Sequence, residues 1–182
     1  MGRNDSEAWR TIHSMCNNDR INEKNLYNKS KMVLSKYRKF CWQTKEDADD
    51  AVCDLCVLAS SDVDGAMVYL ETFSPEHEKE VFESRIKDLF DRRWMIDIVD
   101  TAMIKTREFP DCGELYFEII SKCYLTKWKY TEDEMLEALN LERSRFYDRK
   151  KEAIMIFGIS LWGTAIPRYR KYMCGESDSY PT

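Results

Sequence analysis

A segment near the end of the chain carries the side chains best suited to binding a charged partner. Residues 142–173 contain eight basic side chains and three acidic ones, a net charge of +5, whereas the whole 182-residue chain carries −5. The rest of the chain therefore carries −10. Since opposite charges attract, we expect an anionic partner to approach this segment and to be repelled elsewhere.

The residue types in the first part of this segment match the chemistry of DNA. Arginine can pair bidentately with guanine in the major groove, and lysine and arginine neutralise phosphates. Ser144 can donate a hydrogen bond to a base or to a phosphate, and Asp148 can accept one from cytosine or orient a neighbouring arginine. The alternative interpretation is a charged helix face that only contacts solvent.

Other combinations of reactive residues are weaker. Cys53 and Cys56 form the only CxxC pair, but no second CxxC and no spaced histidine pair accompanies them, because His13 and His77 are isolated. Glycine-rich phosphate loops and a nucleophile with a histidine partner are also missing from the sequence. We therefore expect buried structural thiols, no metal, no cofactor and no enzymatic activity.

Strong local signals position the basic segment on a helix. Thr131 and Glu134 form a capping box, and the short helix that follows carries Met135, Leu136 and Leu139. Asn140 tolerates the left-handed conformation of a sharp turn, and Leu141 is expected to pack into it. A second helix then runs from near Arg143 to Gly158. Two helices joined in this way are the elements of a helix-turn-helix.

A projection of the second helix at about 100° per residue predicts which of its sides is buried. The predicted buried side carries Phe146, Lys150, Ala153 and Phe157. The opposite side carries Ser144, Arg145, Asp148, Lys151 and Glu152, with Arg143 and Arg149 on the flanks. The helix can therefore be buried along one side while it offers polar side chains to a groove.

The rest of the chain predicts an all-α fold, because only six Gly and four Pro are present and apolar residues recur at helical spacing. We expect a tail with at most a short helix at 1–23, an N-terminal helical region at 24–110, the helix-turn-helix region at 111–173 and a tail at 174–182. In the N-terminal region, one helix is predicted over 24–42 and another from Thr44 to about residue 60.

The N-terminal region is also predicted to contain one long helix, from Pro75 to Phe109, of about 50 Å. Its wide apolar arc suggests packing on two sides, either within the fold or against a second copy of the chain. No apolar run is long enough to span a membrane, and seven scattered cysteines fit a reducing compartment. We therefore expect a cytoplasmic protein.

The stretch from Tyr130 to Pro167, YTEDEMLEALNLERSRFYDRKKEAIMIFGISLWGTAIP, resembles the C-terminal helix-turn-helix of ArpU-like phage and prophage transcriptional regulators. That unit is similar to region 4 of sigma factors. The preceding PDCGELYFEIISKCYL resembles the helix that leads into it, so the resemblance covers about 55 residues. The sequence departs from the family pattern at Glu142, a weak N-cap, and at Asp148, where a basic residue is usual.

The resemblance implies a sequence-specific DNA-binding regulator of phage or mobile-element transcription, with double-stranded DNA as its partner. It implies that base edges or phosphates are contacted by Arg143, Ser144, Arg145, Asp148 and Arg149. It also implies that Lys151 contacts the DNA backbone and that Thr131 caps the helix that positions the recognition helix. Arg168, Arg170 and Lys171 add phosphate contacts or form a solvated basic tail. The alternative function is a helical protein-interaction module, an adaptor for RNA polymerase or phage proteins, whose helix-turn-helix does not bind DNA.

Overall fold

The computed structural model describes residues 6–18, 20–44, 93–110, 112–126 and 128–173. Every regular element in these ranges is helical, so the all-α prediction is confirmed. The elements are α1 (Glu7–Asn18), α2 (Glu23–Thr44), α6 (Arg93–Arg107), α7 (Gly113–Ile120), η1 (Ser121–Leu125), α8 (Glu132–Leu139), α9 (Arg143–Ser160), η2 (Leu161–Ala165) and α10 (Ile166–Met173), where η denotes a π-helical turn.

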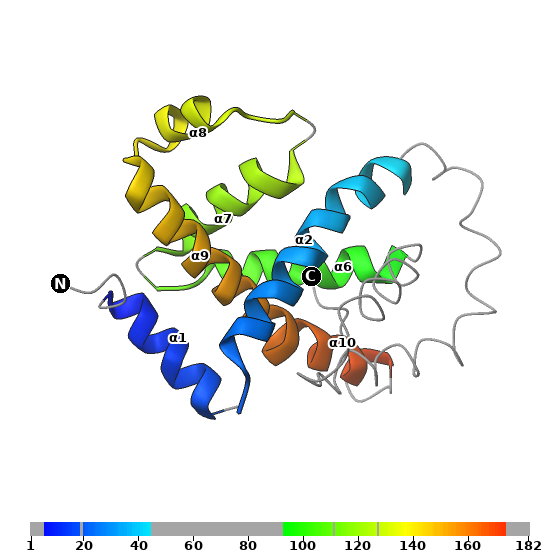
Figure 1. Cartoon of the computed structure of the whole chain (residues 1–182). Helices are drawn as coiled ribbons and strands as arrows, with labels where there is room; N and C mark the ends of the chain where they lie inside the picture. Colours follow the sequence, from blue (N-terminus) through cyan, green and yellow to red (C-terminus); the bar gives the residue numbers. More distant parts are fainter. Residues whose placement is uncertain (1–5, 19, 45–92, 111, 127, 174–182) are drawn as a thin grey trace.

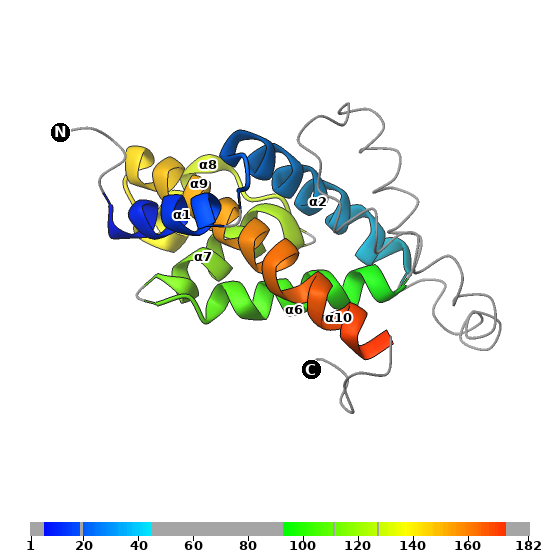
Figure 2. The same ribbon diagram turned by 90° about the horizontal axis from the view of Figure 1, so that it is seen from below.

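The helix α9 passes through the middle of the fold (Figure 1). It contacts α2 on one side and α6 and α7 on the other, and α1 packs against it as well. Figure 2 shows the same order from below, with α2 and α6 on opposite sides of α9. The second half of α9 is therefore enclosed, and all residues from Glu152 to Gly158 are buried.

The core is shared by both halves of the chain. Buried side chains of α1, α2, α6, α7, α9 and α10 form one cluster, which includes Ile12, Leu34, Ile98, Tyr116 and Phe157. The regions expected at 24–110 and 111–173 thus pack against a common interior. Burial of this contiguous apolar surface is the main term that holds the helices in place.

Residues 1–23, expected to form a tail with at most a short helix, contain the 12-residue helix α1, which is packed on the core. Ala8, Trp9, Ile12 and Cys16 are buried, and Ile12 is fully enclosed. These residues recur at intervals of three or four, so one side of α1 is apolar and packs on the core. The polar residues between them belong to the solvent side of the helix.

The predicted helix over 24–42 is confirmed as α2, which buries Leu26, Val33, Leu34 and Tyr37. Of the predicted long helix, the structure describes its last part as α6, which ends at Arg107 shortly before Pro110. Its earlier part lies outside the described residues. The predicted helix from Thr44 to about residue 60, Cys53, Cys56, His77 and the tail at 174–182 also lie outside them.

Candidate nucleic-acid interface

The helix α8 begins with the capping box that the sequence predicts. Thr131 Oγ1 accepts a hydrogen bond of 3.3 Å from the Glu134 backbone N–H. In return, the Glu134 carboxylate accepts one of 2.7 Å from the Thr131 backbone N–H. The Thr131 hydroxyl also donates a 2.9 Å hydrogen bond to this carboxylate, and the bonds from the Thr131 N–H and hydroxyl lower the pKa of Glu134 below its ordinary value. Thr131 therefore fixes where α8 begins, as expected for a capping residue.

The turn between α8 and α9 is also as predicted. Asn140 is left-handed, with φ 49° and ψ 46°, and its backbone N–H bonds to the carbonyls that end α8. Leu141 is half-buried and packs with Leu136 against a small apolar cluster of Ile119, Met135, Leu139 and Phe146. Glu142 occupies the N-cap of α9 without a side-chain capping hydrogen bond. The small cluster thus joins α7, α8 and the start of α9.

The first turn of α9 points its polar side chains into solvent. Arg143, Ser144 and Arg145 are exposed, whereas Phe146, the next residue, is only 2% exposed and anchors the helix in the small cluster. A shallow depression beside this turn is lined by Arg143, Ser144, Tyr147 and Asp148. The structure thus brings Arg143, Ser144 and Asp148 together beside one depression, which Arg145 does not line.

Arg143 is tied to α8. Its Nε lies 2.7 Å from a carboxylate oxygen of Glu132, and the Tyr147 hydroxyl donates a 3.0 Å hydrogen bond to the other oxygen. The Arg143 side chain is nevertheless 73% exposed, so it can exchange Glu132 for another anion. Among the described residues, Arg145 has no ion pair or side-chain hydrogen bond, which leaves its guanidinium available.

The expectation that Glu152 lies on the exposed side of α9 is wrong, because Glu152 is 2% exposed. Its carboxylate accepts hydrogen bonds of 2.6 Å from the Ser6 hydroxyl, 2.9 Å from the Tyr116 hydroxyl and 2.8 Å from Arg149 Nη1. The physical reason is that α1 and the preceding Ser6 pack on this side of α9. A buried carboxylate needs such partners to offset its desolvation.

Arg149 is therefore directed toward the interior, although it was predicted to face DNA. Burial lowers the pKa of Arg149, but attraction to Glu152 and their hydrogen bond outweigh this and leave the pKa above its ordinary value. The guanidinium holds one oxygen of Glu152 together with Tyr116, and its side chain is 33% exposed. Its role in this structure is to support α9.

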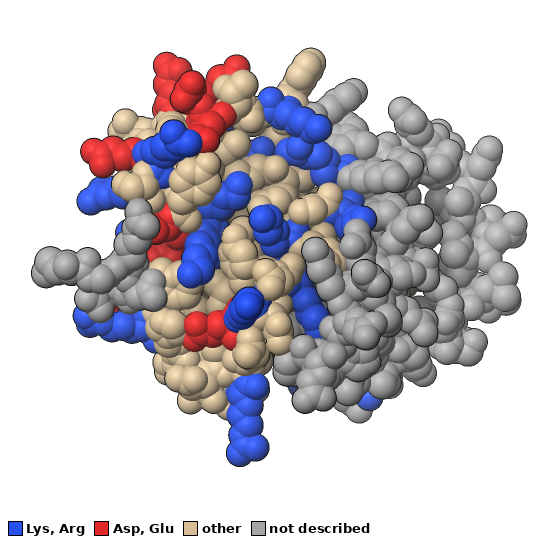
Figure 3. Space-filling model, viewed as in Figure 1, with Lys and Arg blue, Asp and Glu red and all other residues tan. Residues whose placement is uncertain are grey.

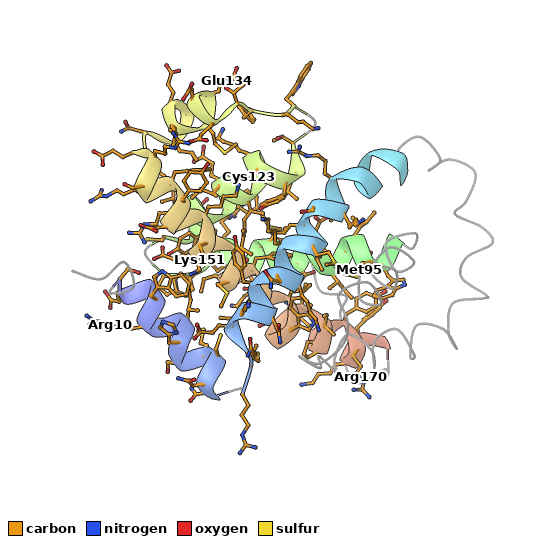
Figure 4. The ribbon with its side chains drawn as sticks, in the orientation of Figure 1. Arg10, Met95, Cys123, Glu134, Lys151 and Arg170 are labelled. Atoms are coloured by element: carbon orange, nitrogen blue, oxygen red, sulfur yellow. The ribbon has the colours of Figure 1, made fainter. Side chains whose placement is uncertain are left out.

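Lys151 is exposed and lies at the side of α9 that faces α1 (Figure 4). Its ammonium group is 4.7 Å from the centre of the Trp9 ring, a cation–π contact that helps to dock α1. Lys150, which was predicted to lie on the buried side, is half-buried and rests over the rings of Tyr124 and Phe146. Arg170 lies on α10, far from α8 in the same view.

Charge is unevenly distributed over this face of the molecule. Figure 3 shows Lys and Arg spread over α9 and α2, whereas Asp and Glu gather mainly over α8. The acidic residues of α8 are Glu132, Asp133, Glu134 and Glu137. An anionic partner is therefore attracted to α9 and α2 and repelled by α8.

Sequence reasoning missed the residues that hold α9 from the N-terminal side, Ser6 and Trp9. A usable signal was present, because Trp9, Ile12 and Cys16 are spaced by three and four residues, as on one side of a helix. It also left α2 out of the candidate site. No local pattern could show that α2 packs beside α9, because contacting residues such as Ser30 and Gly158 are more than a hundred positions apart in the sequence.

In the part of the chain that the structure describes, no helix has both the length and the apolar character that a membrane crossing needs. Within the same residues, no three His, Cys, Asp or Glu side chains are grouped as metal ligands would be. Comparisons of the chain with protein-family models, with curated proteins and with solved structures find no match.

Proposed function

We propose that the chain binds double-stranded DNA in a sequence-specific manner and presents the first turns of α9 to the major groove. The observation that carries this proposal is the exposed group Arg143, Ser144 and Arg145, directly before the buried anchor Phe146. A recognition helix needs this combination, because one side must be held rigidly while polar groups near its N-terminus reach base edges.

The contacts of each residue indicate which part of the duplex it would bind. Arg145, which has no partner among the described residues, is assigned to a base edge, and Ser144 and Asp148 to polar contacts beside it. Arg143 and Lys151 are assigned to phosphates, since both are exposed cations. Arg149 is removed from the contact set, because its ion pair with Glu152 supports the helix from inside.

The resemblance of residues 130–167 to ArpU-like regulators supports a narrower version of the proposal. In that version the DNA contact serves transcriptional control in a phage or mobile element. The acidic surface of α8 constrains the docking, because it must stay away from the phosphate backbone. The duplex is then approached by the side of α9 that lies toward α2.

A second candidate function is supported by a different surface. Trp128, in the segment that leads into α8, is 78% exposed. Tyr130 in the same segment and Tyr147 on α9 are also exposed. Exposed aromatic side chains are enriched in protein interfaces, where Trp and Tyr often contribute most of the binding energy. This surface supports an adaptor that binds a basic or mixed surface of another protein, such as RNA polymerase.

Binding titrations with duplex DNA at several salt concentrations separate the two functions. Selection from a random duplex library first supplies the preferred sequence. Arg145→Ala is expected to reduce the preference for that sequence about fivefold or more, whereas Lys151→Ala weakens all sequences alike. DNA affinity should fall steeply with salt. Binding that is absent, or that neither variant changes, contradicts the proposal.

A further inference from the structure

The helix α2 carries a second cationic surface on the same face as α9. Four residues at intervals of four, three and four form its exposed side: Lys24, Asn28, Lys31 and Ser35. None of them is acidic. The nearest carboxylate on the helix belongs to Glu23, which pairs with His13 of α1. The outward side of α2 is thus positive over its first three turns.

The position of α2 relative to α9 is fixed by close packing. Gly158 of α9 lies so near α2 that a Cβ there would be 2.1 Å from Ser30 Oγ and 2.9 Å from Leu26 Cδ1. Further along α2, the Arg38 guanidinium donates hydrogen bonds of 3.0 and 3.2 Å to the carbonyls of Cys123 and Tyr124. These contacts join α2 to both α9 and η1, so its outward lysines are held by a rigid support.

Further positive charge lies between the two helices. Arg38 of α2 donates to the carbonyls of Cys123 and Tyr124, and Lys150 of α9 lies over the Tyr124 ring, so both cations lie beside η1. Neither cation has a carboxylate partner among the described residues: Arg38 is held by carbonyls, and Lys150 rests on aromatic rings. Lys and Arg side chains are thus found over both α9 and α2, with uncharged residues between them, as Figure 3 shows.

We propose that Lys24 and Lys31 contact the sugar-phosphate backbone of the same duplex whose major groove receives α9. Duplex DNA is the favoured occupant because it carries a charge about every 1.7 Å and can cover the whole α9–α2 surface. The two lysines are seven residues apart, about 10 Å along the helix, which is about the rise of three nucleotides along one strand of the duplex. This inference rests on the proposed function, and it assigns to α2 an affinity that does not depend on base sequence.

The test compares two full-length double variants that remove the same charge. Lys24→Gln with Lys31→Gln neutralises the α2 surface. Lys105→Gln with Arg107→Gln is the matched control on α6, where both side chains are about half exposed and lie near Glu108 and Glu114. Since Figure 2 shows α6 across α9 from α2, the control leaves the proposed surface unchanged. Thermal melts verify that both variants stay folded.

The readout is the slope of log affinity against log salt concentration for a labelled duplex. Removing two phosphate contacts should reduce the magnitude of this slope by about 1.8, because each contact contributes about 0.9. The loss of affinity between about 50 and 200 mM salt should then be about tenfold smaller in the α2 variant. The α6 variant should keep the slope of the original chain.

The outcomes for the two proposals are distinct. If Arg145→Ala reduces sequence preference but the α2 variant keeps the original slope, the role of α2 is overturned and the proposed function stands. An equal change of slope in the α2 and α6 variants also overturns the role of α2, because the salt dependence would then follow only the net charge of the chain. If the unaltered chain binds no duplex, the proposed function fails and this inference fails with it.

Discussion

The Tyr116 hydroxyl donates a 2.9 Å hydrogen bond to the buried Glu152 carboxylate and thereby joins α7 to α9. The same carboxylate also binds Ser6, which precedes α1, and Arg149, one turn earlier on α9. Three segments that are distant in the sequence therefore meet at one charge. The orientation of α9, and of the exposed residues at its start, depends on this polar group in the core.

Replacing Glu152 with glutamine keeps the size of the side chain but removes the charge that Arg149 requires. Since hydrogen bonds to charged groups contribute more than neutral ones, Glu152→Gln should lower the free energy of unfolding by about 2 kcal/mol. Urea denaturation measures this loss. Hydrogen exchange should also become faster in α1, because Ser6 loses its charged acceptor. The exposed Glu137→Gln on α8 is the control, and equal stability of the two variants would refute the role of Glu152.

Alkaline pH should reveal the burial of Tyr116. Burial, and then the nearby Glu152 charge, raise the pKa of Tyr116 above its ordinary value. Above about pH 10 the unfolded chain has released this proton while the folded chain still holds it, so the free energy of unfolding must fall as pH rises.

The matched variant for this measurement is Tyr116→Phe, which has no such proton. Its stability should fall less steeply between about pH 9.5 and 11. Burial also raises the pKa of Tyr124, so part of the slope should remain in the variant. Identical slopes for the two proteins would show that Tyr116 ionises equally well in the folded chain.

The parts of the site that were predicted correctly are those with local causes. The capping box at Thr131, the left-handed Asn140 and the start of α9 depend on residues within a few positions of each other. Helix caps and turns are determined over that range. The exposed state of Ser144 and Arg145 followed from helical periodicity for the same reason.

The second half of α9 could not be predicted in this way. A helical projection assigns one buried side, whereas α9 is enclosed from Glu152 to Gly158 because α1, α2, α6 and α7 all pack on it. Helical periodicity alone predicts that the Glu152 carboxylate faces solvent, because it does not include the partners Ser6 and Tyr116. These partners come from remote parts of the chain, and periodicity carries no information about them.

Two glycines of the same helical segment should respond to alanine in opposite directions. Gly158→Ala places a Cβ against Ser30, whose hydroxyl is held by a 2.7 Å hydrogen bond to the Leu26 carbonyl. Overpacking should destabilise the protein by about 2 kcal/mol, despite the better helix propensity of alanine. A Cβ at Gly163 meets nothing within 4 Å. Gly163→Ala should therefore stabilise by about 0.5 kcal/mol.

Thermal unfolding of the two glycine variants measures both effects side by side. The comparison tests the close approach of α2 to α9, on which the shared cationic surface depends. If Gly158→Ala were as stable as Gly163→Ala, the two helices would have to be further apart than the structure places them.

Glu142 combines two unfavourable features at the start of α9, and two substitutions can separate them. Its side chain makes no capping hydrogen bond, and its charge lies beside Arg143 and Arg145. Glu142→Ser supplies a hydroxyl that can accept from the free N–H groups of the first turn, which should stabilise the chain by about 1 kcal/mol. Removal of the carboxylate should also strengthen duplex binding at low salt, because a charge that repels phosphates is lost.

Glu142→Gln is the matched variant, because it removes the charge without adding a good N-cap. It should strengthen duplex binding as much as Glu142→Ser does, but it should not raise the melting temperature, because it adds no good cap and loses the attraction between the carboxylate and the helix dipole. Anisotropy titrations and thermal melts of both variants measure the two quantities independently. If neither variant binds duplex more tightly than the original chain, the start of α9 does not approach phosphates, and its exposed arginines must serve another partner.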